Sequence, residues 1–238
     1  MNLFLICAPR SRSWFLLNSL CRHYKLDNIG EYFARRYFEL ARDKGVPGFQ
    51  KYIDACKNYN QTSTGLKIFF QNLISHGYLD TADRQLVITK FLETFPIKSD
   101  DKLVVAYRKD SLNQVASFLY ARATNKFIYM SKAEFKNHKM ILDLKDNQII
   151  KVIDLVLSNN LLLPKVLGVL DNHNLTYDLV EYADAEKYLL ENNVRPDSIT
   201  RDNQLDYSTL IENYTELSDK VNIRCNIIKE KLDWIRLE

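Results

Sequence analysis

The chain has 238 residues, of which 46% are hydrophobic and 26% charged, and this length and composition predict one domain spanning residues 1–238. Its 33 basic and 30 acidic side chains nearly cancel, which disfavours nucleic acid as a partner, so any anion site must be local. Four cysteines without a C-x-x-C pair are typical of reduced thiols. No apolar run reaches the roughly 18 residues of a membrane span. We therefore expect a soluble, cytoplasmic protein.

Strands and helices are predicted to alternate along the chain. The apolar run Asn2–Cys7 is typical of a buried strand in a parallel sheet, and helical spacing of apolar residues begins at Trp14. Further strands are predicted at Gly65–Phe70, Lys102–Arg108 and Thr176–Glu181. Helices are predicted over 32–43, 47–58, 71–76, 81–94, from Asp110 through Tyr120, over 147–171 with a bend or break near Pro164, from Asp184 to Asn192, and over 220–238.

This alternation predicts an α/β fold in which a mostly parallel sheet is flanked by helices on both faces. Ligands of such sheets bind outside the carboxyl ends of the strands. The loops after Cys7 and after Arg108 both belong at that edge, so we expect the functional site there.

The loop after the first strand, residues 9–14, has the composition of an anion site. A helix N-terminus offers unpaired backbone N–H groups and a positive dipole end. Arg10 adds a forked cation, and Ser11 and Ser13 add hydroxyls suited to a tetrahedral oxyanion. Alternatively, both serines are helix caps and Arg10 is a solvated charge. Neither G-x-x-x-x-G-K-[ST] nor G-x-G-x-x-G follows a strand, which disfavours a kinase and a dinucleotide enzyme.

The strand Asn2–Cys7 and the loop after it resemble the 5′-phosphosulfate loop of sulfotransferases that use 3′-phosphoadenosine 5′-phosphosulfate (PAPS), closest to the bacterial trehalose type. The resemblance implies a P-loop-like α/β fold. It also implies a donor-binding loop made of Pro9, Arg10, Ser11, Arg12, Ser13 and Trp14. Arg12 stands where the family commonly has Gly. A Cβ is tolerated there only without a positive φ, so we expect a slightly different loop in which Arg12 adds a second cation.

A second segment resembles the family's 3′-phosphate site. Arg108 ends a predicted strand, and Ser117 follows nine residues later on the next helix, about 2.5 turns on. The two side chains can converge on one phosphate if the intervening turn folds back. Alone, an Arg at a strand end is more often a salt-bridge partner. Two phosphate motifs in the right order are far more specific than either by itself.

Three further residues follow from the resemblance. Glu31 matches the proposed general base of the trehalose type, because an attacking hydroxyl must lose its proton; alternatively it only favours a helix dipole. Lys67 matches the family's Gly-x-Lys strand and would share electrostatic work with Arg10; alternatively it is an edge-facing strand residue. Arg201 echoes the C-terminal cofactor loop. The region 125–175 matches nothing in the family, and we expect it to shape the acceptor pocket.

The resemblance as a whole implies transfer of a sulfuryl group from PAPS to a hydroxyl of a small-molecule acceptor, without a metal, with Glu31, Arg10 and Lys67 as catalytic residues. Trehalose-type members pair as dimers, so a homodimer is a further expectation, which no feature of this sequence supports by itself. Two alternatives stay open. One is a non-catalytic module that binds an adenosine 3′,5′-bisphosphate compound. The other is a small-molecule kinase, which needs a Walker lysine and a magnesium-holding carboxylate that the sequence does not display.

Overall fold

The computed structural model describes residues 1–8, 10–31, 57, 59–69, 92, 97–124, 139–197 and 205–233. They contain a five-stranded sheet in the order β2-β3-β1-β4-β5, in which every pairing between neighbours is parallel. The strands are β1 Leu3–Cys7, β2 Asp27–Gly30, β3 Thr64–Phe69, β4 Lys102–Tyr107 and β5 Asp178–Glu181. The helices are α1 Ser13–Tyr24, α6 Ser111–Thr124, α7 Asn147–Asn172, α8 Ala185–Glu191, α9 Tyr207–Leu210 and α10 Tyr214–Asp233.

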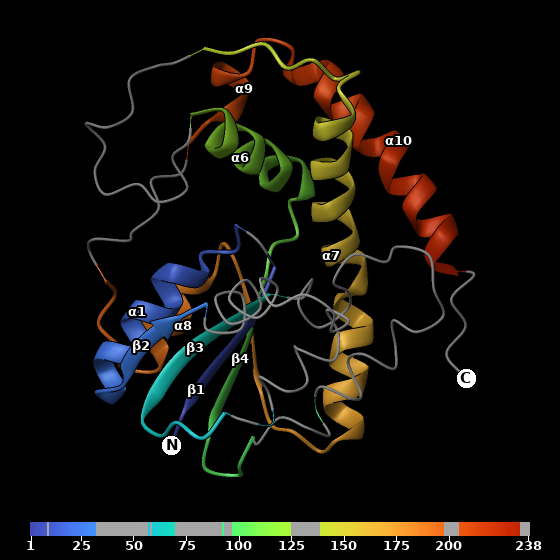
Figure 1. The fold of residues 1–238 in the computed structure, drawn as a ribbon. Helices are drawn as coiled ribbons and strands as arrows, with labels where there is room; N and C mark the ends of the chain where they lie inside the picture. Colours follow the sequence, from blue (N-terminus) through green and yellow to red (C-terminus); the bar gives the residue numbers. More distant parts are fainter. Residues whose placement is uncertain are drawn as a thin grey trace, which may run out of the picture.

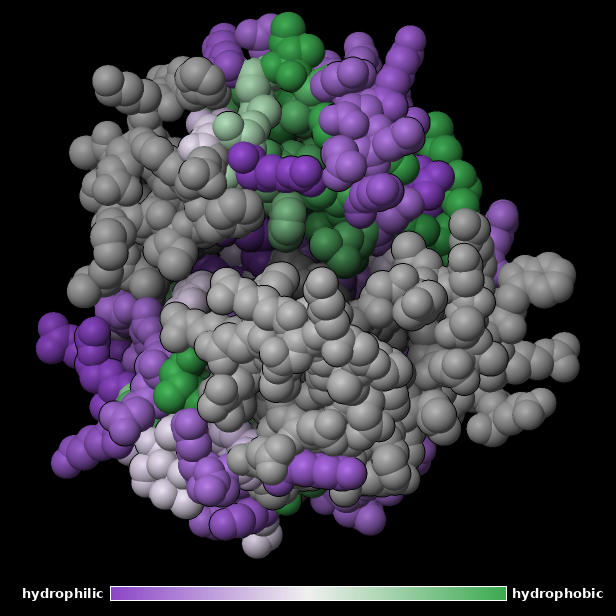
Figure 2. Space-filling model, viewed as in Figure 1, coloured by the Kyte–Doolittle hydropathy of each residue, from purple (hydrophilic) through white to green (hydrophobic). Residues whose placement is uncertain are grey.

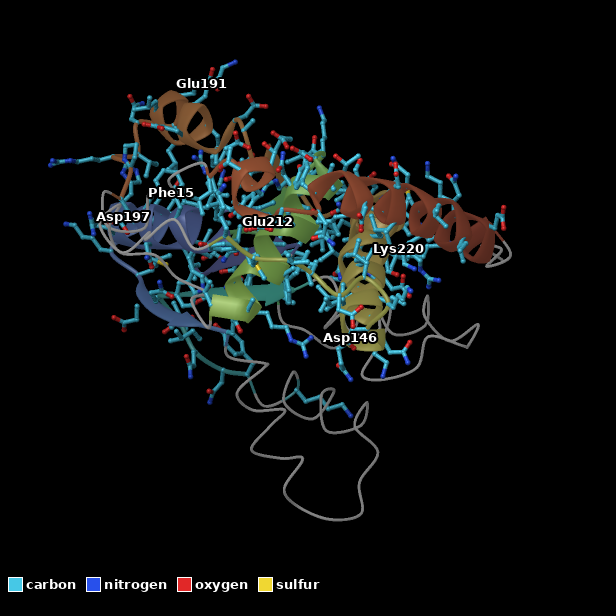
Figure 3. The ribbon with its side chains drawn as sticks, turned by 90° about the horizontal axis from the view of Figure 1, so that it is seen from above. Phe15, Asp146, Glu191, Asp197, Glu212 and Lys220 are labelled. Carbon is cyan, nitrogen blue, oxygen red and sulfur yellow. The ribbon has the colours of Figure 1, made fainter. Side chains whose placement is uncertain are left out.

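Helices cover both faces of the sheet, which confirms the predicted fold class. Helices α1 and α8 lie on one face, α7 on the other, and α6 lies beyond the carboxyl ends of the strands (Figure 1). Seen from above, the helices on the two faces of the sheet lie on opposite sides of the molecule (Figure 3). The labelled Phe15, Glu191 and Asp197 lie on the α1 side, and Asp146 and Lys220 lie toward α7 and α10.

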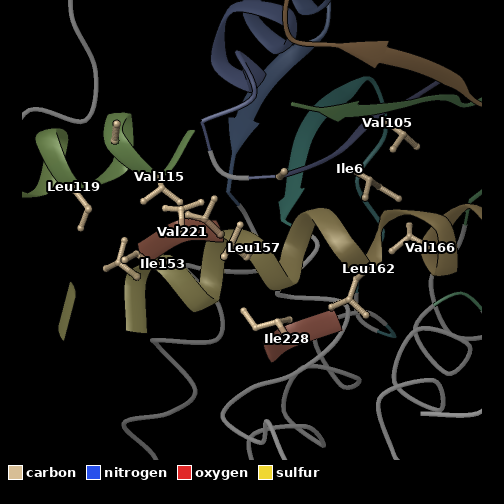
Figure 4. Close-up of a cluster of buried hydrophobic side chains, with 14 of the residues drawn as sticks. Ile6, Val105, Val115, Leu119, Ile153, Leu157, Leu162, Val166, Val221 and Ile228 are labelled. Atoms are coloured by element: carbon tan, nitrogen blue, oxygen red, sulfur yellow. The ribbon is translucent and has the colours of Figure 1, made fainter. Parts of the chain in front are cut away.

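The two core clusters follow from the alternation of side chains along buried strands. In β1, Phe4 and Ile6 join the cluster under α7, whereas Leu3, Leu5 and Cys7 join the cluster under α1. Strand β1 packs against apolar clusters on both faces and so is apolar at every position, which explains its continuous apolar run. Figure 4 shows the larger cluster, in which side chains from the sheet, α6 and α10 meet along α7.

Helix α7 runs continuously through Pro164, so the predicted break does not occur. Its length and a mean hydropathy of 1.5 over an 18-residue window would allow it to cross a membrane, and it is the one such helix among the described residues. In the structure its apolar side chains, including Ile153, Leu157 and Val166, are buried in the core (Figure 4). Packing on both sides of Pro164 explains how the helix tolerates a residue that removes one backbone hydrogen bond. This helix makes up much of the region 125–175 expected to shape the acceptor pocket, and its described role is core packing.

Helix α10 confirms the predicted packing of the C-terminal helix on its own domain. It begins at Tyr214, before the predicted 220, and its Val221 and Ile228 are buried against the cluster under α7. Strand β2, which extends the sheet beyond β3, was not predicted from the sequence. The predicted helices over 32–43, 47–58, 71–76 and 81–94 lie, apart from single positions, outside the described residues.

Gly65 allows α1 to pack closely on β3. A Cβ at this position would lie 2.0 Å from Sγ of Cys21 on α1, so no larger residue fits without a shift of the helix. The first turn of α1 lies over the same strand, where Nζ of Lys67 is 4.3 Å from the ring centre of Trp14.

The strand order has a switch point between β1 and β4. From β1, the chain passes through α1 to β2 on one side of the sheet, whereas β4 and β5 lie on the other side of β1. The segments that leave β1 and β4 therefore diverge at neighbouring strand ends. In open α/β sheets ligands bind at such a switch point, and the candidate site lies there.

Candidate anion-binding site

The loop between β1 and α1 is built from two left-handed residues. Arg10 has φ 59° and Arg12 has φ 58°. Arg12 therefore adopts the glycine-like conformation that its Cβ was expected to exclude, at a cost of about 1 kcal/mol. The expectation that Arg12 has no positive φ was wrong.

The serines of this loop do not cap the helix. Helix α1 has Arg12 at its N-cap position, and the Arg12 side chain makes no capping hydrogen bond. The hydroxyl of Ser11 instead donates to the carbonyl of Ala8 at 2.7 Å, which closes the loop upon the end of β1. The N-cap position is therefore held by neither of the two serines, and the capping role suggested for them is wrong.

Arg10 joins the two predicted phosphate segments. Its Nε donates to Oγ of Ser117 on α6 at 2.8 Å, across 107 positions of sequence. Ser117 is 2% exposed, so its hydroxyl is held in place beneath the loop. The alternative that Arg10 is only a solvated charge is therefore wrong. The Ser117 hydroxyl accepts from Arg10 and keeps its own hydrogen to donate.

Arg108 lies at the end of β4 with its side chain buried. Its guanidinium carbon lies 4.0 Å from the ring centre of Tyr182, and that of Arg12 lies 4.8 Å from the same ring centre. The Nε of Arg108 is buried and makes no hydrogen bond within the described part of the chain. Together with Arg10, these side chains give the carboxyl edge a concentration of positive charge. Figure 2 shows a hollow in the surface beneath α6 in which hydrophilic residues are visible.

Lys67 and Glu31 form an ion pair on the α1 side of the sheet. Nζ of Lys67 lies 2.7 Å from Oε1 of Glu31 and 4.3 Å from the ring centre of Trp14. Lys67 is 2% exposed, on a strand paired with both β1 and β2, so the alternative that it faces an edge is wrong. Glu31, directly after β2, is one third exposed. The pair places a carboxylate reachable from solvent beside a buried ammonium.

Gly30 fixes the position of the Trp14 ring. It has φ 62°, and an added Cβ would lie 3.0 Å from Cη2 of Trp14. We expect Gly30→Ala to lower the free energy of unfolding by about 1–3 kcal/mol, through backbone strain and displacement of the ring, as measured by urea unfolding. Gly168→Ala in α7 is the matched control, since an added Cβ there meets no described atom within 4 Å. It should stabilise by about 0.5–1 kcal/mol. Equal stability of Gly30→Ala and the unmodified protein would contradict this account.

Cys7 ends β1 beneath the loop. Burial raises the pKa of its thiol to about 12, although the nearby Lys67 ammonium and the hydroxyls of Ser13 and Ser11 act to lower it. An unfolded thiol ionises near 9, so below that pH the thiol is protonated in both states and stability does not depend on it. Above pH 9 the unfolded state ionises first, and stability is lost as the pH rises toward 12.

Because the Cys7 thiol ionises in the unfolded state, we expect it to lower the free energy of unfolding by about 1 kcal/mol between pH 8 and pH 10. Urea unfolding at the two pH values measures the loss, and Cys7→Ala should show a loss smaller by that amount. The same pH dependence in both proteins would mean that Cys7 ionises alike in the folded and unfolded chains.

The structure thus brings most of the predicted site residues together in two neighbouring groups. The first contains Arg10, Arg12, Arg108 and Ser117, and the second contains Trp14, Lys67 and Glu31 with Ser11 and Ser13 near Cys7. Pro9 and Arg201 lie outside the described residues. Among the described residues, no group of three or more His, Cys, Asp or Glu side chains could hold a metal ion.

Two residues of this region were not predicted from the sequence. Tyr182 directly follows β5, and the rule that ligands bind at the carboxyl ends of strands would have pointed to it. Asp197 is 2% exposed and accepts hydrogen bonds from Arg22 at 3.1 Å and from Asn18 at 3.4 Å, so it anchors the chain after α8 to α1 (Figure 3). No sequence signal marks Asp197, because its partners lie on a helix more than 170 positions earlier.

The fold and the site define an α/β protein with a cationic site at the carboxyl edge of a parallel sheet. No protein-family model matches the chain, and no curated protein matches it significantly. Among solved structures, it is similar to the YorR protein of Bacillus subtilis in complex with phosphorylated GDP, with a TM-score of 0.40 and 11% identity, over 81% of this chain and 96% of that chain. At this identity and score the similarity assigns no ligand or activity.

Proposed function

We propose that this protein is a PAPS-dependent sulfotransferase that transfers a sulfuryl group to a hydroxyl of a small-molecule acceptor. The observation that carries the proposal is the hydrogen bond from Arg10 to Ser117, because it joins the loop that resembles the phosphosulfate loop to the segment that resembles the 3′-phosphate site. The donor carries a phosphosulfate at the 5′ position and a phosphate at the 3′ position of the same ribose. The two sites that bind these groups must therefore lie close together. The buried Arg108 beside them supports the second site.

In this scheme the donor's 5′-phosphosulfate lies against the loop of residues 9–14 and the first turn of α1. The acceptor oxygen attacks sulfur, and its proton passes to the Glu31 carboxylate. The bond between sulfur and the bridging oxygen of the 5′-phosphate breaks, and adenosine 3′,5′-bisphosphate leaves with the electron pair. Arg10 and Lys67 offset the charge that develops on the leaving group. The chain forms no covalent bond to the sulfuryl group, so positioning and electrostatics supply the rate.

Calorimetric titration with adenosine 3′,5′-bisphosphate, AMP and ATP in the absence of metal tests the donor site. The proposal expects tight binding of the bisphosphate and little of the other two. An acceptor screen with PAPS, in which adenosine 3′,5′-bisphosphate release is followed by chromatography, then tests transfer. Equal affinity for the three nucleotides would remove the basis for both phosphate sites, and binding that requires magnesium would favour a small-molecule kinase instead.

A second candidate is a module that binds the bisphosphate without catalysis. The ion pair between Lys67 and Glu31 favours it, because the carboxylate proposed as base already accepts a hydrogen bond from the ammonium at 2.7 Å. This candidate predicts tight bisphosphate binding and no release of the bisphosphate from PAPS with any acceptor in the screen.

A further inference from the structure

The ring of Tyr182 is shared by arginines from two distant parts of the chain. Arg108 directly follows β4, Arg12 belongs to the loop after β1, and both guanidinium carbons lie within 4.8 Å of the ring centre. Tyr182 directly follows β5, and its backbone N–H donates to the carbonyl of Tyr107 at 2.8 Å. Its side chain is buried. The ring is therefore fixed at the carboxyl edge, beside both cations.

Two guanidinium groups beside one buried ring are suited to an anion. They repel each other, and the negative face of the ring offsets only part of this repulsion. Arg108 is 8% exposed, and its Nε is a buried donor without a hydrogen-bond acceptor in the described part of the chain. An anion between the two groups would satisfy that donor and neutralise the like charges.

The separation of the two cations fits one phosphate. Because Arg12 and Arg108 contact the same ring centre, their guanidinium carbons cannot be farther apart than the two ring distances together. An N–H donor reaches a phosphate oxygen at about 2.8 Å, so both groups can bind oxygens of the same phosphate from two sides. A phosphomonoester offers three acceptor oxygens and close to two negative charges at pH 7, which matches two forked cations. A sulfate ester carries a single charge.

We propose that Tyr182 is a positioning residue whose ring holds Arg12 and Arg108 so that both bind one phosphomonoester dianion. Under the proposed function, on which this inference rests, that group is the donor's 3′-phosphate. Arg12 then makes a contact that the glycine common at this place in sulfotransferase loops cannot make. The ring acts through the arginines and needs no contact with the phosphate itself.

The ratio of the dissociation constants of AMP and adenosine 3′,5′-bisphosphate measures the contribution of the 3′-phosphate. Calorimetry compares the unmodified protein with Tyr182→Phe and Tyr182→Leu. We expect Tyr182→Phe to keep the ratio, because the ring is retained, and Tyr182→Leu to reduce it about tenfold with AMP affinity unchanged. Circular dichroism of each variant shows whether it is folded. Tyr177→Leu, just before the amino end of β5, is the matched control and should keep the ratio.

Two outcomes separate this inference from the proposed function. If the unmodified protein prefers the bisphosphate and Tyr182→Leu keeps the same ratio, Tyr182 does not position the arginines and the inference is overturned. If the unmodified protein shows no preference, the proposed function fails instead, and titration with inorganic phosphate, followed by phosphorus NMR, decides the inference alone. Phosphate binding kept in Tyr182→Phe and lost in Tyr182→Leu supports it, and binding that is absent or the same in all three proteins overturns it.

Discussion

Replacing Glu31 with glutamine is expected to lower kcat by about a hundredfold to ten-thousandfold while the affinity for adenosine 3′,5′-bisphosphate stays unchanged. The amide has the size of the carboxylate and can still accept a hydrogen bond from Lys67, which lies 2.7 Å from Oε1 of Glu31, but it cannot take the proton of an acceptor hydroxyl. Steady-state kinetics with PAPS and an acceptor found in the screen give kcat, and calorimetry gives the affinity.

The buried ammonium makes a folding control necessary for this variant. Lys67 is 2% exposed, and replacing Glu31 with an amide removes a counter-charge from this buried cation. Thermal unfolding followed by circular dichroism reports that effect. Asp27→Asn makes the same acid-to-amide change at the first position of β2, whereas Glu31 follows the last. It should leave kcat unchanged. A normal kcat in a folded Glu31→Gln protein would exclude Glu31 as the base.

Replacing Arg108 with alanine is expected to weaken bisphosphate binding about a hundredfold, with little change for AMP. Its guanidinium is a buried cation at the end of β4, and a phosphate that it binds is shielded from water. Without the guanidinium, the 3′-phosphate loses a charged partner that solvent cannot replace. Calorimetric titration with the two nucleotides measures both affinities.

Two variants show whether the loss comes from this side chain or from charge in general. Lys109→Ala removes the neighbouring exposed cation and should change the affinity less than about threefold, because solvent and salt screen it. Arg108→Lys keeps a charge without the planar fork and should lose most of the affinity. Bisphosphate binding by Arg108→Ala at the affinity of the unmodified protein would show that the 3′-phosphate lies elsewhere or that no such ligand binds.

The sequence predicted the central strands and the place of the site because both depend on local patterns. A strand that packs against apolar clusters on both faces has a continuous apolar run, which marks β1 and β4 without knowledge of their partners. The edge strand β2 was missed because three of its four residues are not buried and it has no apolar run. Asp110 was predicted as a helix cap, and its Oδ1 accepts from the backbone N–H of Asn113 at 2.9 Å. Such short-range bonds can be read directly from sequence.

Only the tertiary structure decided which charged side chains meet. Arg10 and Ser117 are 107 positions apart, and the ring shared by Arg12 and Arg108 comes from the end of another strand. Such contacts depend on strand order and on the close packing of α1 over β3, and no local pattern encodes either. The strained φ of Arg12 and the continuous helix through Pro164 have the same origin. The sequence by itself determined an α/β sheet with a basic loop at its carboxyl edge, and long-range packing assembled that loop into a site with two groups of charged side chains.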